Sequence, residues 1–140
     1  MKLILLLFLG VYMTISAQEI AVVRYMEGTV LAKSEAGTKL LKVGSSLEEN
    51  MLIITKESAL VTIIFKDNSV LNLGENSLLK LDKFVFKPQN EEYSFDLFLQ
   101  KGGLIFESGK IGDLAPEEFE LKTPDGMVAI RGTKFEVNVK

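Results

Sequence analysis

The sequence TPDGMVAIRGTKFEVNV, residues 123–139, decides how this chain is interpreted. It holds a turn, a short apolar run, an Arg-Gly-Thr step and then an alternating segment. In that segment Phe135, Val137 and Val139 fall on one face, and Glu136 and Asn138 fall on the other. Alternation with a period of two is typical of a half-buried β-strand. We therefore expect a strand here that completes a β-sheet.

The composition indicates one ordinary globular domain. The chain has 140 residues, of which 47% are hydrophobic and 25% are charged. A disordered chain of this length would contain fewer apolar residues. The formal net charge is −3, so the chain lacks the excess of Lys and Arg that is typical of nucleic-acid binding, and we expect no nucleic-acid partner.

The residues that the chain lacks restrict its chemistry. It has no His and no Cys, which removes imidazole bases, thiolate nucleophiles, disulfides and the usual zinc ligands. The pairs Glu48-Glu49, Glu91-Glu92 and Glu117-Glu118 are adjacent, so on a strand their members point to opposite faces and form poor acid–base dyads. Asp113 with Glu117-Glu118 supplies too few oxygens for calcium. We therefore expect no enzymatic activity, no cofactor and no metal.

Residues 1–17 have the organisation of a secretory signal peptide. Lys2 gives a positive start, residues 3–13 are apolar, and small and polar residues follow. The apolar run is shorter than the ~20 residues that a membrane helix needs. We predict cleavage after Ala17, a mature domain at residues 18–140 without a transmembrane helix, and a periplasmic or secreted location. The alternatives are an uncleaved N-terminal anchor and a buried first strand.

Short apolar runs separated by turn residues fill the rest of the chain. Only residues 110–120 favour a turn of helix, because Pro116 precedes two glutamates there. Many short strands with a turn every 8–12 residues predict an all-β domain. Gly102-Gly103 and Gly109-Lys110 lack the spacing of a phosphate-binding loop and are predicted to be turns. The predicted strands cover residues 20–26, 29–32, 40–43, 51–55, 59–65, 70–73, 78–86, 93–99, 104–106, 119–122 and 135–139.

One local repeat bears on the architecture. NSVLNL at residues 68–73 recurs as NSLLKL at residues 76–81, with leucines at alternate positions in both copies. Strands stacked in a β-solenoid produce such repeats, and a β-hairpin produces the same pattern. On the pattern alone, sandwich, barrel and solenoid all stay open.

The order of these segments resembles the FecR domain, the periplasmic domain of iron-dicitrate-type sensor and regulator proteins. The resemblance covers residues 28–139, and its most specific part is Thr123-Pro124 followed by RGTKF at residues 131–135. The other segments that carry it are residues 28–30, 43–47, 53–55, 58–65, 67–69, 71–73, 76–81, 103–106, 119–122 and 128–130.

The resemblance implies a small all-β domain of short stacked strands, β-solenoid-like, with a β-sandwich as the alternative. It also implies signal relay or binding without catalysis. In the best-known members, the domain receives a signal from an outer-membrane receptor and a membrane helix passes it to a cytoplasmic segment that controls a sigma factor. Here a signal peptide stands in place of that segment and helix, so the anti-sigma role is not carried over.

We therefore expect an exported protein-interaction or sensing module of the cell envelope, with one or more envelope proteins as partners. The alternative function is a structural or glycan-associated envelope protein. Exposed aromatic side chains would support that alternative, and the candidates are Phe84, Phe86 and Tyr93.

Eight residues that carry the family signature are expected to be structural, and the binding surface is left unidentified. They are Asp67, Ser69, Thr123, Pro124, Arg131, Gly132, Thr133 and Phe135. Asn68 stands where the family usually has Gly, which predicts a positive φ there. Arg131 either offers its guanidinium to a partner's carboxylate or phosphate, or binds internal acceptors. We favour internal acceptors, because a half-buried Arg needs a partner.

Overall fold

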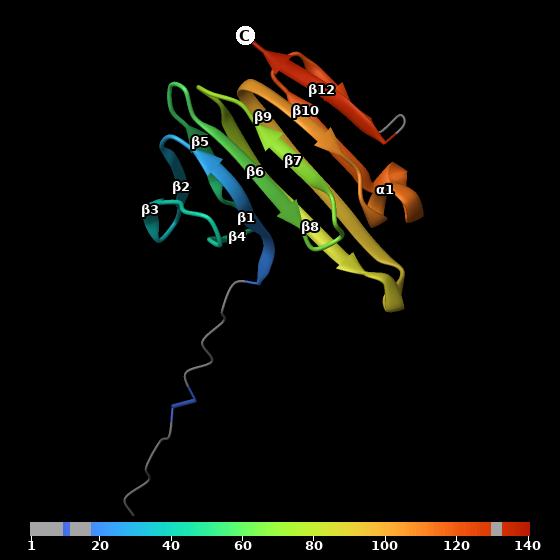
Figure 1. Cartoon of the computed structure of the whole chain (residues 1–140). Helices are drawn as coiled ribbons and strands as arrows, with labels where there is room; N and C mark the ends of the chain where they lie inside the picture. Colours follow the sequence, from blue (N-terminus) through green and yellow to red (C-terminus); the bar gives the residue numbers. More distant parts are fainter. Residues whose placement is uncertain (1–9, 12–17, 130–132) are drawn as a thin grey trace, which may run out of the picture.

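The computed structural model of the chain describes residues 10–11, 18–129 and 133–140, and its secondary structure is almost entirely β-strand (Figure 1). The strands are β1 (Glu19–Glu27), β2 (Val30–Ser34), β3 (Gly37–Leu40), β4 (Ser46–Glu48), β5 (Leu52–Thr55), β6 (Leu60–Phe65), β7 (Val70–Leu73), β8 (Leu78–Lys87), β9 (Glu92–Glu107), β10 (Phe119–Thr123), β11 (Gly126–Val128) and β12 (Lys134–Val139). The helical elements are η1 (Pro88–Asn90), α1 (Lys110–Leu114) and η2 (Pro116–Glu118).

The strands form one open sheet that curls into a half-barrel. Its main order is β3-β2-β5-β8-β9-β7-β6-β1-β4, with β10 and β12 also paired to β9 and β11 paired to β10. The β10–β9 pair is parallel, whereas the other pairs are antiparallel. Figure 1 shows β12 at one margin of the sheet, away from β2 and β3 at the other.

β9 joins the two halves of the sheet. Its first part pairs with β8 and β10, and its last part, from Gly102 onward, pairs with β7 and β12. Gly102 and Gly103 therefore lie inside a continuous strand, and the predicted turn at these residues is wrong. Gly102 has a φ of +94°, and a Cβ there would lie 1.9 Å from Ser77 Oγ. The glycine is needed for this close approach and for a left-handed backbone, not for a chain reversal.

An aromatic cluster fills the inside of the curl. The ring of Phe95 lies at its centre, with centroids 4.7 Å from Phe65, 4.9 Å from Phe84, 5.2 Å from Phe119 and 5.6 Å from Phe106. These five rings come from β6, β8, β9 and β10, and all of them are buried. Tilted and edge-on pairs of this kind add about 0.5–1.5 kcal/mol each beyond their burial. The cluster therefore ties both halves of the sheet together.

The all-β class predicted from the sequence is confirmed, as is the turn of helix within residues 110–120. Neither the solenoid-like stack nor the sandwich is confirmed. The predicted strand at residues 40–43 is wrong beyond Leu40. There the backbone turns, with Ser45 N donating to Lys42 O at 3.0 Å. β4 was missed because its sequence, Ser-Leu-Glu, carries no apolar run.

The repeat at residues 68–73 and 76–81 marks two equivalent strand starts. Asn68 and Asn76 both have positive φ, at 68° and 51°. The strands that follow them, β7 and β8, lie on either side of β9. The two copies are therefore related through β9 and form neither a hairpin nor adjacent coils of one stack.

Candidate functional site

The turn at Asp67 is buried and holds three segments together. Asp67 is fully buried, and its carboxylate accepts hydrogen bonds from Ser69 N at 3.0 Å, Ser69 Oγ at 2.8 Å and Ile111 N at 3.1 Å. Lys110 N donates to the carbonyl oxygen of Asp67 at 2.7 Å. The turn that leads into β7 thus fixes the start of α1, which is 44 residues later in the chain.

Ser69 and Gly109 complete this turn. Gly109 N donates to Ser69 Oγ at 2.9 Å. A Cβ on Gly109 would lie 2.2 Å from Asp67 O and 2.4 Å from Ser69 N, so only glycine fits there. Asn68 has the positive φ that the sequence predicted. With these contacts, Asp67 and Ser69 form a buried lock with no atom left for a ligand to reach.

A second lock lies at the other copy of the repeat. Ser77 is fully buried, and its Oγ accepts a hydrogen bond from Gly103 N at 3.2 Å. Ser77 N donates to Thr55 Oγ1 at 2.8 Å, and Thr55 Oγ1 donates to Gly74 O at 2.6 Å. Ser77 lies in a segment that carries the family resemblance, residues 76–81, but it was not among the eight signature residues, although the repeat points to it. We call the two turns, centred on Ser69 and Ser77, the serine locks.

Thr123 and Pro124 lie at the hairpin that connects β10 to β11. Asp125 N donates to Thr123 Oγ1 at 3.3 Å, and Thr123 Oγ1 donates to Gly126 O at 3.2 Å. Pro124 is exposed, and Gly126 has a φ of +155°. These contacts close the turn locally and leave the hairpin tip in solvent.

The remaining signature residues belong to the strand β12 and the segment before it. Arg131 and Gly132 lie outside the described residues. Ser108 N donates to Thr133 O at 2.8 Å, which anchors the start of β12. Phe135 is half-buried, with its ring centroid 5.4 Å from that of Phe106. The alternation predicted for residues 135–139 is confirmed, because exposed and half-buried residues alternate along β12.

The three aromatic side chains considered for glycan binding belong to the core or pack against it. Phe84 is 7% exposed, and Phe86 and Tyr93 pack against the core as partly buried side chains. Tyr25 is 48% exposed, and its hydroxyl donates to Glu27. That bond raises the pKa of Tyr25. A platform of exposed rings is therefore not found among the described residues.

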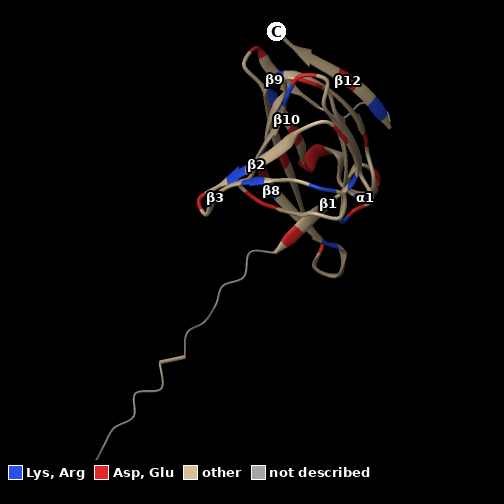
Figure 2. Cartoon of the chain, turned by 60° about the vertical axis from the view of Figure 1, so that its left-hand side comes forward, with Lys and Arg blue, Asp and Glu red and all other residues tan. Residues whose placement is uncertain are grey.

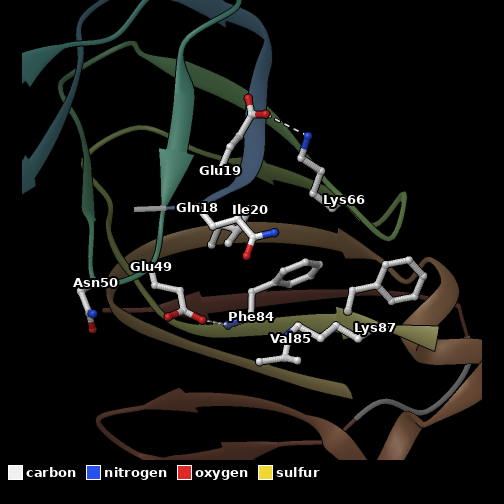
Figure 3. Close-up of a pocket in the computed structure, with 10 residues that line it drawn as sticks. Gln18, Glu19, Ile20, Glu49, Asn50, Lys66, Phe84, Val85 and Lys87 are labelled. Carbon is white, nitrogen blue, oxygen red and sulfur yellow. Dashed lines mark hydrogen bonds and ion pairs between the residues drawn. The ribbon is translucent and has the colours of Figure 1, made fainter. Parts of the chain in front are cut away.

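A pocket of about 300 Å³ opens where β1 begins and β8 ends (Figure 3). Three of its charged groups have partners within the chain: Lys66 Nζ lies 2.8 Å from Glu19 Oε2, and Phe84 N donates to Glu49 Oε1 at 2.9 Å. The hydrogen bond with Lys66, followed by that with Ser46, holds the pKa of Glu19 below its ordinary value. These contacts engage Glu19, Lys66 and Glu49 within the chain.

Charges of both signs are spread around the curled sheet (Figure 2). One carboxyl group on its outer face is perturbed: burial, and then the neighbouring Glu120, raise the pKa of Asp96. In the described part of the chain, no three His, Cys, Asp or Glu side chains gather to hold a metal ion. No helix in that part is long and apolar enough to cross a membrane.

The comparison with protein families decides the assignment. The family model described as FecR protein matches residues 51–140, which contain both serine locks, the β10–β11 hairpin and β12. The chain belongs to the FecR family. Members of this family are regulatory sensors rather than enzymes.

The other comparisons add little. No curated protein matches this FecR-family chain. A solved structure described as "Cell surface anchoring domain" is similar to it, with a TM-score of 0.42 and 27% sequence identity, over 44% of this chain and 82% of that one.

Proposed function

We propose that this FecR-family chain is an exported, non-catalytic module of the cell envelope that senses or relays a signal by binding another envelope protein. Residues 1–17 act as a signal peptide that is removed after Ala17, and the domain at residues 18–140 works in the periplasm or outside the cell. The absence of His and Cys from the sequence supports a role without catalysis.

One observation carries this proposal: β12 presents a free backbone edge. Among the described strands, β12 pairs with β9 alone. It has 6 residues, whereas the other edge strands β3, β4 and β11 have 4, 3 and 3. An edge of this length is a template for an added strand, because its outward N–H and C=O groups need partners.

The side chains of β12 favour such an addition. Phe135, Val137 and Val139 face the core side but stay half-buried, whereas their counterparts Val61, Ile63 and Phe65 in β6 are fully buried. An added strand with apolar residues at alternate positions would cover them further. Burial of this apolar area, together with main-chain hydrogen bonds, accounts for binding without a deep pocket.

Photo-crosslinking in the intact envelope tests this function. A photoreactive amino acid replaces Asn138 in β12 in one variant and Lys39 in the exposed edge strand β3 in a control variant. We expect Asn138 to yield one discrete protein adduct and Lys39 to yield none. No adduct from either site, together with sedimentation of the chain with purified cell wall, would instead establish the glycan-associated alternative.

Export is tested separately. The N-terminal residue of the protein recovered from the envelope fraction is determined by mass spectrometry. We expect Gln18. Recovery of the intact N-terminus in the membrane fraction would replace the signal peptide with an uncleaved anchor.

A further inference from the structure

A groove beside β12 lies on the outer face of the sheet. It has a volume of about 320 Å³ and runs over β7, β9 and β12. We call it the β12 groove. Its lining includes Asn72, Gly74, Glu75, Ile105, Glu136 and Asn138.

Two glycines make the floor of the β12 groove. Gly74 N donates to Gly103 O at 2.8 Å, so the two backbones meet directly. A Cβ on Gly103 would lie 2.5 Å from Asn138 Oδ1, so a larger residue would collide with the groove wall. Leu60 and Ile105 supply apolar walls, and Ile105 is 36% exposed.

The polar groups of the groove are held in place by their own hydrogen bonds. Thr62 Oγ1 donates to Asn72 Oδ1 at 2.6 Å, and Asn138 Nδ2 donates to Glu136 Oε1 at 3.2 Å. Ser58 N donates to Glu75 Oε2 at 2.6 Å. Each carboxylate thus has one oxygen engaged and a second oxygen left to accept. In the part of the chain that the structure describes, neither Glu75 nor Glu136 forms an ion pair.

The groove therefore suits a ligand that is positively charged, rich in donors and attached to an apolar stem. An anion would meet two carboxylates, and a purely apolar group would leave them desolvated without a partner. Lysine and arginine side chains meet all three requirements, because their charged heads donate to carboxylates and their methylene stems pack on apolar walls.

We propose that the β12 groove receives one lysine or arginine side chain from the protein that docks on β12. This inference rests on the proposed function, since it concerns the same partner. An added strand places its outer-face side chains about 4.5–5.5 Å from Glu136 and Asn138. A long basic side chain from that strand then extends over β12 to Glu136 and Ile105, with Glu75 at the far wall.

The partner strand therefore carries a recognisable pattern. Its alternate apolar residues face Phe135, Val137 and Val139, and a basic residue stands on its other face. The main-chain pairing provides affinity, and the basic residue provides register and selectivity.

Two synthetic peptides test this inference with the full-length mature chain. The first alternates valine and threonine and has one arginine at a threonine position. The second is identical except that citrulline, which is uncharged and similar in shape, replaces the arginine. Binding of each labelled peptide is measured by fluorescence anisotropy, for wild type and for the double variant Glu75→Gln, Glu136→Gln.

We expect wild type to bind the arginine peptide at least about tenfold more tightly than the citrulline peptide, since a hydrogen bond to a charged donor is stronger than one to a neutral donor. The double variant should lose this preference, because glutamine keeps the hydrogen bond from Ser58 but not the charge. Glu107→Gln, on the outer face of β9 but outside the groove, is the matched control and should keep the preference.

The outcomes separate the two proposals. Equal binding of both peptides to wild type would overturn the basic-residue groove and leave strand docking at β12 intact. Binding of neither peptide, with no adduct from Asn138 in the envelope, would overturn both. A preference for arginine that survives in the double variant would place the basic residue elsewhere on the surface.

Discussion

The serine locks and the β12 edge are two regions of one sheet that differ in burial and in how completely their polar groups are hydrogen-bonded. In the locks, Asp67, Ser69 and Ser77 are buried and every side-chain oxygen has a partner within the chain. In β12, no residue is fully buried and one backbone edge is unpaired among the described strands. The signature residues of the locks hold the sheet together, whereas the open edge at β12 is the surface where we propose that a partner docks.

Of the substitutions that test this difference, Gly109→Ala in the first serine lock should lower the stability of the fold most. The added Cβ would collide with the backbone at Asp67 and Ser69, which cannot move without opening the lock. We expect the free energy of unfolding to fall by more than about 4 kcal/mol, as in the severe class of core substitutions. Urea denaturation followed by circular dichroism measures this.

Gly44→Ala is the control for Gly109. Gly44 has a positive φ, at +91°, whereas Gly109 has a φ of −100°, and no atom lies within 4 Å of the position that a Cβ on Gly44 would take. We expect Gly44→Ala to lower the free energy of unfolding by about 1–2 kcal/mol, because of its backbone conformation alone. Similar losses for Gly109→Ala and Gly44→Ala would show that the first lock contributes no packing of its own.

Asp67→Ala should have the next largest effect. It removes the acceptor of three hydrogen bonds and leaves the N–H groups of Ser69 and Ile111 buried without partners. Each such donor costs about 1–3 kcal/mol, so we expect a loss of about 3 kcal/mol in total. Thermal denaturation checks the value, and a melting temperature unchanged from wild type would contradict a structural role for this turn.

Replacing phenylalanines by alanine measures how much less a side chain contributes to stability in β12 than in the core. Phe106→Ala, in β9, should lower the free energy of unfolding by about 3–5 kcal/mol, because the side chain is 1% exposed. Phe135→Ala, in β12, should cost only about 1–2 kcal/mol, because its ring is half-buried. Equal losses in chemical denaturation would mean that β12 belongs to the core.

The smallest predicted effect concerns Asp96. Burial, and then the nearby Glu120, raise the pKa of its carboxyl group. Since the folded pKa lies above the unfolded one, the ionised carboxylate destabilises the fold at neutral pH, and the penalty disappears as the pH falls below about 3.9. Asp96→Asn should therefore raise the free energy of unfolding by less than about 0.5 kcal/mol at pH 7 and leave it unchanged at pH 3. A gain that is constant from pH 3 to pH 7 would exclude this cause.

Local patterns in the sequence predicted most strands, because residues 59–65 form a short apolar run bounded by turn residues and residues 135–139 alternate strictly. The positive φ of Asn68 was predicted from the family resemblance, because Asn68 stands where the family usually has Gly. The continuous course of β9 was not predictable, since Gly102-Gly103 in isolation is a turn signal. Only the approach of Ser77, 25 residues away in the sequence, explains the glycine.

The candidate site was harder to predict from the sequence than the fold. Asp67 and Ser69 were predicted to be structural residues. Their partners Gly109 and Ile111 could not be predicted, because they lie 40 and 44 residues later in the sequence. The β12 groove could not be predicted, because Asn72, Ile105 and Glu136 come from three different strands. Which strands become neighbours is set by the sheet order, and no local pattern encodes that order.

Amide hydrogen exchange of the isolated mature domain measures whether β12 is an open edge of the sheet. We expect the amides of β7, which lies between the serine locks, and of β6, which pairs with it, to exchange only through global unfolding. The amides of β12 that do not pair with β9 should exchange orders of magnitude faster, and the crosslinked or peptide-bound form should protect them. Protection of every β12 amide to the level of β6 in the isolated protein would contradict the claim that β12 is an open edge.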